Sequence, residues 1–373
     1  MAASTPASRN IIQDIINNLR FDCTTLKSCS RVSRDFSAYT RPHLFHLIRG
    51  ISIKIESCYS IDALISISRH VRAVRLSNDD LFNATMPLII SSFDHLEHIC
   101  ILGYVNLSAL PGDMIKALTC QRSLVTSLEL NAVDYTDIRI LNQFLQPYLG
   151  LRKLGLLNMR FDMRAYSVGK TGASGPKPQP MELSLHAGTL LRPFLYPHSP
   201  ASLNRLQKLS VSALFMEDFM SLALVIRLAP NLRELHLRGL QKDSRWFKPK
   251  PLDLSSIEVV SFNLFEANEE FEQHLHPGLI LAWWIESFRS GVALRSITMT
   301  VQVNTTENGL INARLWEWFD AILGSLGTIK AVRGIIRGEK GHVLKKMIDN
   351  KCNRLTVRGL MEIRVNGPQR KGE

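Results

Sequence analysis

The sequence predicts an α/β solenoid, in which short parallel strands form a curved sheet and helices cover its outer face. Two observations predict this fold. Apolar residues with the spacing Leu-x-x-Leu-x-Leu recur along the chain, and amphipathic helical stretches separate the copies. The clearest copy spans residues 232–237. Side chains of an extended segment alternate, so Leu235 and Leu237 share one face while Glu234 and His236 share the other.

Nine copies of this pattern lie in register. They begin at positions 48, 71, 96, 125, 151, 180, 206, 232 and 257, which are 23 to 29 residues apart. This is the period of a leucine-rich-repeat solenoid, whose core grows as repeats stack. A further copy at Leu294 follows after 37 residues. We therefore expect residues 49–328 to form the solenoid.

The segments between these strands predict the outer helices and two loops. Amphipathic spacing predicts helices at 61–68, 114–118, 138–149, 216–228, 279–288 and 310–323. Residues 162–181 are rich in glycine and proline without apolar periodicity, which predicts a flexible loop, and residues 241–253 form a basic loop that contains prolines. From residue 329 the pattern is strand, helix (340–350) and strand (355–365), so residues 329–373 are predicted to be a basic cap and tail.

The net charge of +12 is concentrated at the two ends of the chain. Residues 1–50 hold seven Lys and Arg against three Asp and Glu, and residues 329–373 hold twelve against four. The remaining residues hold 26 of each sign, which argues against a long nucleic-acid groove along the solenoid. No apolar run reaches the roughly 18 residues that a transmembrane helix needs.

The first 48 residues predict a small helical module. Residues 1–8 have a disordered composition, and residues 9–48 contain two or three short helices. The first helix carries an apolar stripe of Ile11, Ile12, Ile15, Ile16 and Leu19. Asp22 or Thr24 is expected to cap a second helix, which Pro42 interrupts. That helix places four residues on one side: Leu26, Cys29, Val32 and Phe36.

This module resembles the F-box found at the head of many fungal F-box proteins with irregular leucine-rich repeats. The resemblance covers residues 7–48 and rests on the isoleucine stripe, on the stretch 25–36 and on the stretch 41–45. It implies that the module binds a Skp-type adaptor through Ile11, Ile12, Ile15, Ile16, Leu19, Leu26, Val32, Phe36 and Leu44. Two positions depart from the family: Ala7-Ser8 replaces Leu-Pro, and Phe36 replaces Trp. Both usually help to seat the adaptor, so the departures are expected either to weaken adaptor binding or to abolish it.

No motif for catalysis, a cofactor or a metal is present in convincing form. Gly169-Lys170-Thr171 has the end of a phosphate-binding loop, but Arg164 stands where its first glycine is required. The six cysteines form no Cys-x-x-Cys pair, and the spaced histidine pairs have no further ligands at a familiar spacing. We expect no enzyme activity, no cofactor and no metal. Two pairs of tryptophans lie on predicted helices: Trp283 with Trp284, and Trp316 with Trp318. We expect at least one tryptophan of each pair to pack in the core.

The surface that remains for recognition is the concave face of the sheet. The side chains that alternate with core residues are predicted to line it, and we select seven as target-binding candidates: Arg75, His98, Glu129, Lys153, Glu234, His236 and Arg238. The F-box resemblance implies a substrate receptor of a Skp–cullin–F-box ubiquitin ligase, which reaches a cullin through the adaptor and acts in the cytoplasm or nucleus.

Two other functions stay open at this stage. In the first, the protein is a non-ligase protein-interaction scaffold, and the N-terminal helices only cap the open end of its solenoid, which needs such a cap. Alternatively, the protein binds nucleic acid or an anionic membrane surface through its basic C-terminus. The basic residues there are Lys345, Lys346, Lys351, Arg354 and Arg358.

Overall fold

The computed structural model divides into two compact units. Unit 1 comprises residues 1–154 and 159–178, and unit 2 comprises residues 155–158 and 179–373. The described residues are 6–20, 22–45, 47–49, 68–120, 124–135, 138–161, 175–186, 188–195, 199–215, 218–241, 250–265, 277–302, 312–338 and 341–366. The predicted helix at 61–68 therefore lies almost wholly outside them, as do most of the loops 162–181 and 241–253.

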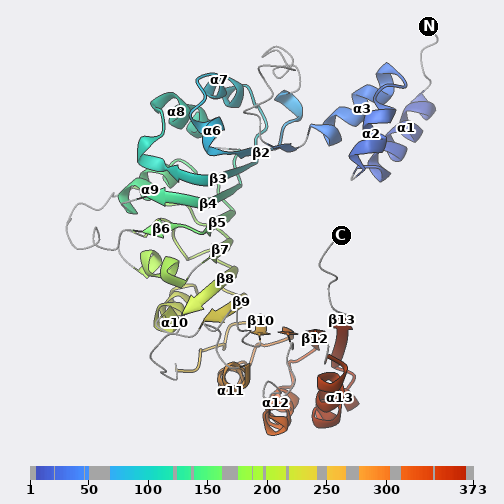
Figure 1. Ribbon diagram of the computed structural model, residues 1–373, viewed down its shortest axis with the longest axis vertical. Helices are drawn as coiled ribbons and strands as arrows, with labels where there is room; N and C mark the ends of the chain where they lie inside the picture. The colour runs from blue at the N-terminus through green and yellow to red at the C-terminus, as the bar shows by residue number, and fades with distance from the viewer. Residues whose placement is uncertain are drawn as a thin grey trace. The chain divides into compact units, whose positions relative to one another are not determined.

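Unit 1 begins with the helical module, formed by α1 (Pro6–Asn18), α2 (Cys23–Cys29) and α3 (Arg34–Leu44) (Figure 1). Helix α3 packs against both α1 and α2. The predicted cap of α2 is Asp22, whose carboxylate accepts hydrogen bonds from the backbone N–H of Thr24 (3.1 Å) and of Thr25 (3.0 Å). The hydroxyl of Thr25 donates to the same carboxylate, and this hydrogen bond is the main cause of the lowered pKa of Asp22.

The prediction that the second helix continues through Phe36 is wrong, because the chain turns between α2 and α3. Ser33 caps α3 by accepting a hydrogen bond from the N–H of Phe36 (3.2 Å). Pro42 does not interrupt the helix either. It lies in the last turn of α3, where its missing N–H removes one hydrogen bond while the N–H of Phe45 still reaches the carbonyl of Arg41 (3.0 Å).

The strands of unit 1 form a parallel ladder in chain order. They are β1 (Leu47–Arg49), β2 (Ala73–Leu76), β3 (His98–Asn106), β4 (Ser127–Tyr135) and the start of β5 (Lys153–Leu157), and β6 (Arg160–Phe161) pairs with β4. Helices follow these strands: η1 (Ser68–His70), α6 (Asn78–Leu81), α7 (Met86–Ser91), η2 (Leu107–Ala109), α8 (Gly112–Cys120) and α9 (Ile138–Leu145).

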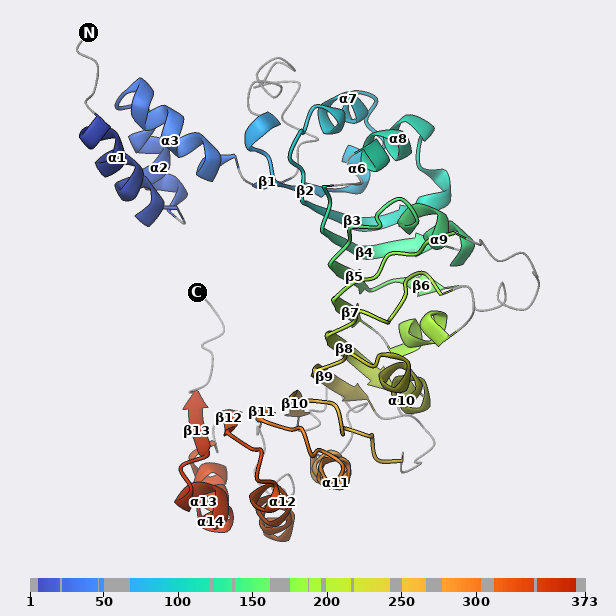
Figure 2. The ribbon, with the colours of Figure 1, turned by 180° about the vertical axis from the view of Figure 1, so that it is seen from behind.

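Unit 2 repeats the same arrangement. Its parallel strands are β7 (Glu182–His186), β8 (Lys208–Phe215), β9 (Glu234–Gln241), β10 (Val259–Phe265), β11 (Ser296–Gln302), β12 (Ala331–Arg337) and β13 (Met361–Asn366). The helices are η4 (Gly188–Leu195), α10 (Phe219–Leu228), α11 (Pro277–Phe288), α12 (Ala313–Ser325), α13 (Gly341–Lys351) and α14 (Asn353–Val357). Helices α10 to α13 all lie on one side of these strands (Figure 2).

The predicted inward and outward alternation is confirmed. The three apolar positions of each copy at Val71, Leu96, Val125, Leu151, Leu206, Leu232, Ile257 and Leu294 are at most 2% exposed. In most of them the N–H of the first apolar residue donates to the carbonyl three residues earlier, as Leu232 does to Ala229 (3.0 Å). This turn ends the preceding segment and starts the strand at a fixed place.

A second backbone feature recurs where each strand begins. One carbonyl accepts two successive N–H groups from the next repeat: Gln207 accepts from Arg233 and Glu234, and Arg233 in turn accepts from Glu258 and Val259. Each repeat is therefore held in register by the repeat before it, as expected of a structure whose parts contact only their neighbours.

A left-handed backbone conformation also recurs five residues after the start of several strands. Gly103, Ala132, Asn158 and Gly239 have φ values of +98°, +57°, +51° and +63°. In β3 this position coincides with a shift of register between Leu102 and Val105. Glycine adopts this conformation without strain, whereas the Cβ of Ala132 makes it costly.

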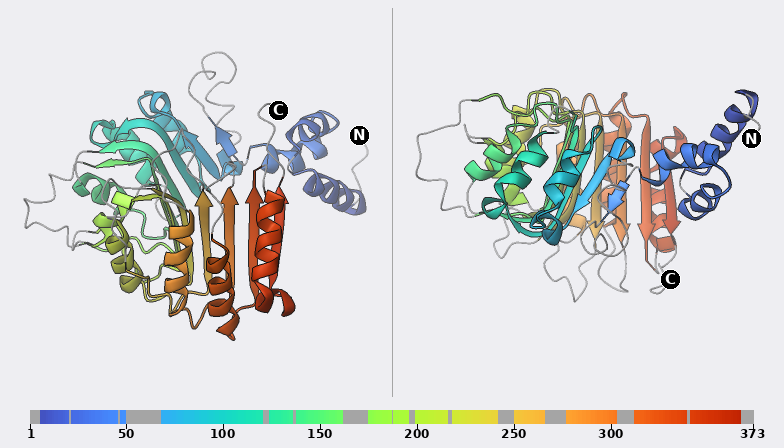
Figure 3. Two further views of the ribbon diagram at one scale, coloured as in Figure 1. Left: turned by 60° about the horizontal axis from the view of Figure 1, so that its bottom comes forward. Right: turned by 90° about the horizontal axis from the view of Figure 1, so that it is seen from above.

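The region predicted as a cap continues the parallel ladder. Strand β12 pairs with β11 and β13 pairs with β12, and all run in the same direction (Figure 3). The strand predicted at 355–365 begins only at Met361, because Asn353–Val357 is helical. Asp320 of α12 explains this helix: its buried carboxylate accepts hydrogen bonds from the N–H of Arg354 (3.0 Å) and of Leu355 (2.9 Å), which caps α14 from a neighbouring helix.

The core of unit 2 contains a chain of aromatic rings. Phe219 contacts Trp283, and Trp284 stacks between Phe262 and Phe288 with ring centroids 4.9 and 5.5 Å away. Trp283, Trp284 and Trp316 are buried, while Trp318 is partly exposed beneath the guanidinium of Arg289. The expectation that core packing takes at least one tryptophan of each pair is therefore confirmed, and it takes both of the first pair.

Candidate protein-interaction surfaces

The helical module separates the predicted adaptor-binding residues into a core and a surface. Ile16 and Leu26 are fully buried, so their assignment to a binding surface is corrected: they hold the three helices together. Ile11, Ile15 and Val32 are 61%, 44% and 69% exposed. The remaining four lie at the boundary and are partly exposed: Ile12, Leu19, Phe36 and Leu44.

The exposed apolar residues come from two places in the module. Ile11 and Ile15 are four residues apart in α1 and therefore lie on one face of that helix. Val32 lies in the turn between α2 and α3, where its N–H donates to the carbonyl of Cys29 (3.0 Å). The residues that depart from the F-box pattern lie at the starts of two helices. Ala7 and Ser8 are in the first turn of α1, and Phe36 is in the first turn of α3.

In unit 1, the register of the strands brings several predicted target-binding residues together. Arg75, Cys100 and Glu129 are neighbours on β2, β3 and β4, and His98 begins β3 two residues before Cys100. The thiol of Cys100 donates to a carboxylate oxygen of Glu129 (3.5 Å). Lys153 begins β5, and its backbone N–H bonds to the carbonyl of Thr126 (2.9 Å). All of these side chains are exposed or partly exposed.

Cys100 is not a reactive thiol in this setting. Burial is the largest cause that raises its pKa to about 11, and the carboxylate of Glu129 adds to that increase more than Arg75 opposes it. Burial likewise raises the pKa of Cys352 to about 12, and its Sγ lies 3.6 Å from the carbonyl of Trp316. Both remain protonated at neutral pH, which excludes them as thiolate nucleophiles.

In unit 2, Glu234, His236 and Arg238 lie on the exposed face of β9. One carboxylate oxygen of Glu234 lies 3.4 Å from Lys208 Nζ and 3.4 Å from His236 Nε2. Burial is the main cause of the lowered pKa of His236, the positive charges of Lys208 and Arg238 add to it, and Glu234 opposes it. His236 is therefore neutral at pH 7, and the face carries the charges of Lys208, Glu234 and Arg238.

Hydroxyl groups extend this face across the neighbouring strands. The register aligns Ser184, Ser210, His236, Ser261 and Thr298 from β7 to β11. Beside this row, His186 Nδ1 and Ser212 Oγ are 2.7 Å apart. The part of unit 2 that the structure describes thus presents a row of uncharged hydrogen-bonding groups next to a small charged cluster, which suits recognition of a polar protein surface.

Several basic residues of the C-terminal region have partners within the protein. Lys345 pairs with Asp349 at 2.6 Å, Lys351 pairs with Glu317 at 2.6 Å, and the guanidinium of Arg358 donates to the carbonyl of Gly324 (3.0 Å). These contacts reduce the charge available to phosphate groups. They favour the expectation that nucleic-acid binding is weak.

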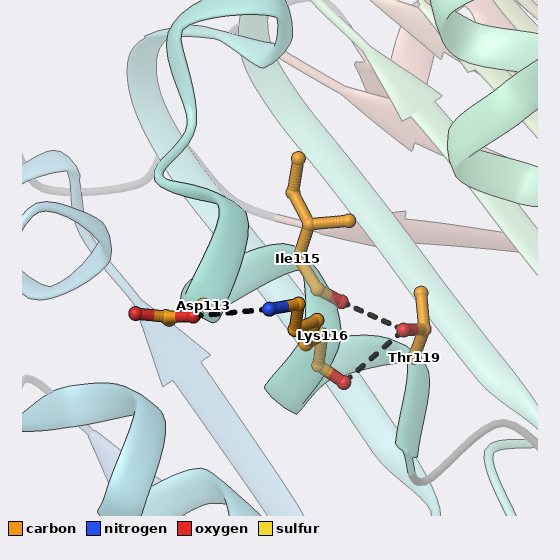
Figure 4. A network of polar contacts seen from close by, with 4 residues as sticks. All are labelled: Asp113, Ile115, Lys116 and Thr119. Atoms are coloured by element: carbon orange, nitrogen blue, oxygen red, sulfur yellow. Dashed lines mark hydrogen bonds and ion pairs between the residues drawn. The ribbon is translucent and has the colours of Figure 1, made fainter.

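One exposed polar network on the described surface is structural. On α8, Lys116 lies 3.5 Å from Asp113, and the hydroxyl of Thr119 donates to the carbonyls of Ile115 and Lys116 (Figure 4). Both charged side chains are highly exposed, so this pair contributes little to stability. Within the described ranges no cluster of three or more His, Cys, Asp or Glu side chains could hold a metal ion, and no helix combines the length and hydrophobicity of a membrane span.

Comparison with known proteins gives little further identification. No family model and no curated protein matches the chain. Among solved structures, the chain is similar to the crystal structure of the Rad7 and Elc1 complex in yeast, with 14% identity, coverage of 89% of this chain and 88% of that chain, and a TM-score of 0.39. A likeness at this level does not identify a function.

Proposed function

We propose that this protein is the substrate-recognition subunit of a Skp–cullin–F-box ubiquitin ligase, working in the cytoplasm or nucleus. The helical module binds the Skp-type adaptor, and through it the cullin, while the strand faces bind a target protein. The protein itself does no bond chemistry. Its role is to raise the effective concentration of target lysines near the thioester of the conjugating enzyme.

The observation that carries this proposal is the exposure of Ile11, Ile15 and Val32 on a module of about forty residues. The module already has a core in Ile16 and Leu26, so the exposed isoleucines and valine are not needed to hold it together. Several exposed apolar side chains on so small a module are typical of a protein-binding site. The resemblance of the same residues to an F-box supports an adaptor as the partner.

The target side of the proposal is supported by the polar face of unit 2. Lys208, Glu234, His236 and Arg238 project from neighbouring strands whose backbone is fixed by the ladder. A rigid backbone positions side chains at little entropic cost on binding. Because binding energy concentrates in a few residues, we assign target recognition in this unit to Glu234, His236 and Arg238. Arg75, His98, Glu129 and Lys153 form the corresponding candidates in unit 1.

Two sets of variants test the two sides separately. Replacing Ile11 and Ile15 together with Glu should abolish capture of the adaptor and cullin in affinity purification, while target capture is kept. Replacing Gln13 and Asn17 with Glu is the matched control, because it adds the same charge to exposed positions of the same helix. Reversing Glu234 and Arg238 and replacing His236 with Ala should have the opposite effect. Equal adaptor capture by the Ile11/Ile15 variant and the wild type would instead favour the non-ligase scaffold.

A further inference from the structure

The last strand of the ladder in unit 2 has one strand neighbour. Within the described residues, β13 pairs with β12 alone. The N–H of Val332 donates to the carbonyl of Leu360 (2.7 Å), which sets the phase of this parallel pairing. In a parallel pair alternate residues face the neighbour. The backbone groups of Glu362, Arg364 and Asn366 therefore point to β12, and those of Met361, Ile363 and Val365 point to the open edge.

The apolar side chains of β13 are also less covered than those of the strand before it. Val332 and Ile336 of β12 are fully buried, whereas Met361, Ile363 and Val365 are only partly buried. Ile363 packs over Gly334 and Val365 over Gly341, so each is covered on the side of β12 and α13. The two helices between β12 and β13 in the sequence also carry exposed apolar residues: Val343 of α13 is 57% exposed and Val357 of α14 is 87% exposed. One more strand would cover what β12 and α13 leave open.

The opposite face of the same two strands is positively charged. Arg333 and Arg337 on β12 are exposed, and the register places Arg364 of β13 beside Ile335, between them. Glu362 offsets part of this charge through its ion pair with Arg364 at 2.6 Å. Three arginines against one glutamate favour an acidic partner. They disfavour a second copy of this chain, because edge-to-edge pairing would bring two such clusters together.

We propose that the open edge of β13 binds an extended, acidic segment of a partner protein, which adds to the sheet as a further strand. The segment's backbone pairs with Met361, Ile363 and Val365. Its apolar side chains cover Ile363 and Val365 on one face, and its carboxylates face Arg364 on the other. The residues of this surface differ from those assigned to adaptor and target binding, and the proposal does not depend on the proposed ligase role.

A peptide probe tests this pairing with the full chain. We would titrate a fluorescently labelled nine-residue peptide of alternating Val and Asp and follow its anisotropy. Binding in the micromolar range is expected, and a Lys-for-Asp peptide should bind at least about tenfold more weakly because its charges are reversed. Two further peptides carry backbone N-methyl groups, one at its odd-numbered positions and the other at its even-numbered positions. Only the parity that faces β13 should lose at least about tenfold in affinity, since the other points to solvent.

Protein variants locate the site. Ile363→Pro removes an outward N–H without removing a hydrogen bond to β12, so it should lower the affinity for the peptide at least about tenfold. Ile363→Val keeps that N–H and should bind the peptide with an affinity within about twofold of the wild type. Unfolding curves establish that both variants fold, and Arg364→Gln supplies a second test of the charged face should the proline variant unfold. Equal binding of both N-methyl peptides would overturn strand addition. Tighter binding of duplex DNA or anionic vesicles, or a dimer in sedimentation velocity, would overturn the acidic protein segment as the occupant.

Discussion

The helical module and the ladder of unit 2 use apolar residues differently. In the ladder, the three apolar positions of the copies at 206, 232, 257 and 294 are all buried, because strands alternate strictly and each repeat stacks on the next. In the module, Ile15 is exposed while its neighbour Ile16 is buried. A short helix with a broad apolar stripe has enough surface for a core and for a partner. Apolar periodicity in the ladder thus marks buried positions, whereas in the module it marks both buried positions and the exposed ones that we propose bind the adaptor.

The sharpest contrast should come from a charge placed in each region. Leu235→Asp buries an unpaired carboxylate between stacked repeats, so it should destabilise by roughly 3–5 kcal/mol and abolish soluble expression. Ile11→Asp places the same group at an exposed position and should change stability by less than about 0.5 kcal/mol. Soluble yield measures the effect of Leu235→Asp, and urea unfolding measures that of Ile11→Asp. A folded Leu235→Asp protein would show that the assigned register is wrong.

The two capping aspartates give the next contrast. Asp320 is buried and accepts two backbone N–H groups of α14, so Asp320→Ala leaves both without a partner and should cost about 2 kcal/mol. Asp22 caps α2 in full contact with solvent, where water replaces the lost hydrogen bonds, and Asp22→Ala should have a smaller effect. The midpoints of thermal unfolding compare the two. A larger loss for Asp22→Ala would contradict the assigned role of Asp320.

A smaller effect should come from the left-handed position of the strands. Ala132→Gly removes a strained Cβ and should stabilise unit 1 by up to about 1 kcal/mol, whereas Gly239→Ala introduces one and should destabilise unit 2 by a similar amount. Denaturant titration of the two variants is the measurement. Changes of the same sign in both would show that the positive φ is not what matters at these positions.

The smallest effect concerns pH. Burial lowers the pKa of His236 below its ordinary value of 6.5, so its contribution to stability is present above that pH and is lost as pH falls through the lowered value. Lys208, Glu234 and Arg238 face the same group. His236→Gln should reduce the loss of stability between pH 7.5 and pH 5.5. Asp22, whose pKa is also lowered, loses its contribution only in the acid range below about pH 4. An unchanged pH dependence in His236→Gln would contradict this assignment.

The ladder was predictable from the sequence, while the module and the C-terminal end were only partly so. A side chain on a strand points to one of the two faces of the sheet, and the recurrence of apolar residues at Leu235 and its equivalents shows which face is buried. The direction of Ile11 or Ile16 depends on how α1 meets α3, which periodicity does not encode. The helix α14 was missed because its cap, Asp320, is more than thirty residues away in the sequence. Of the predicted site residues, the strand faces came out exposed or partly exposed, and Ile16 and Leu26 proved to be core.

The central claim is that the module binds a Skp-type adaptor, and direct titration of the purified chain with a purified adaptor tests it. We predict binding with a Kd of tens of micromolar or tighter, because a standard-size interface weakened at Ala7-Ser8 and Phe36 still registers in this range. Replacing Ile11 and Ile15 with Glu should remove it, and the Gln13/Asn17 control should keep it. No detectable binding of the wild-type chain at these concentrations would contradict the account and leave the module as a cap.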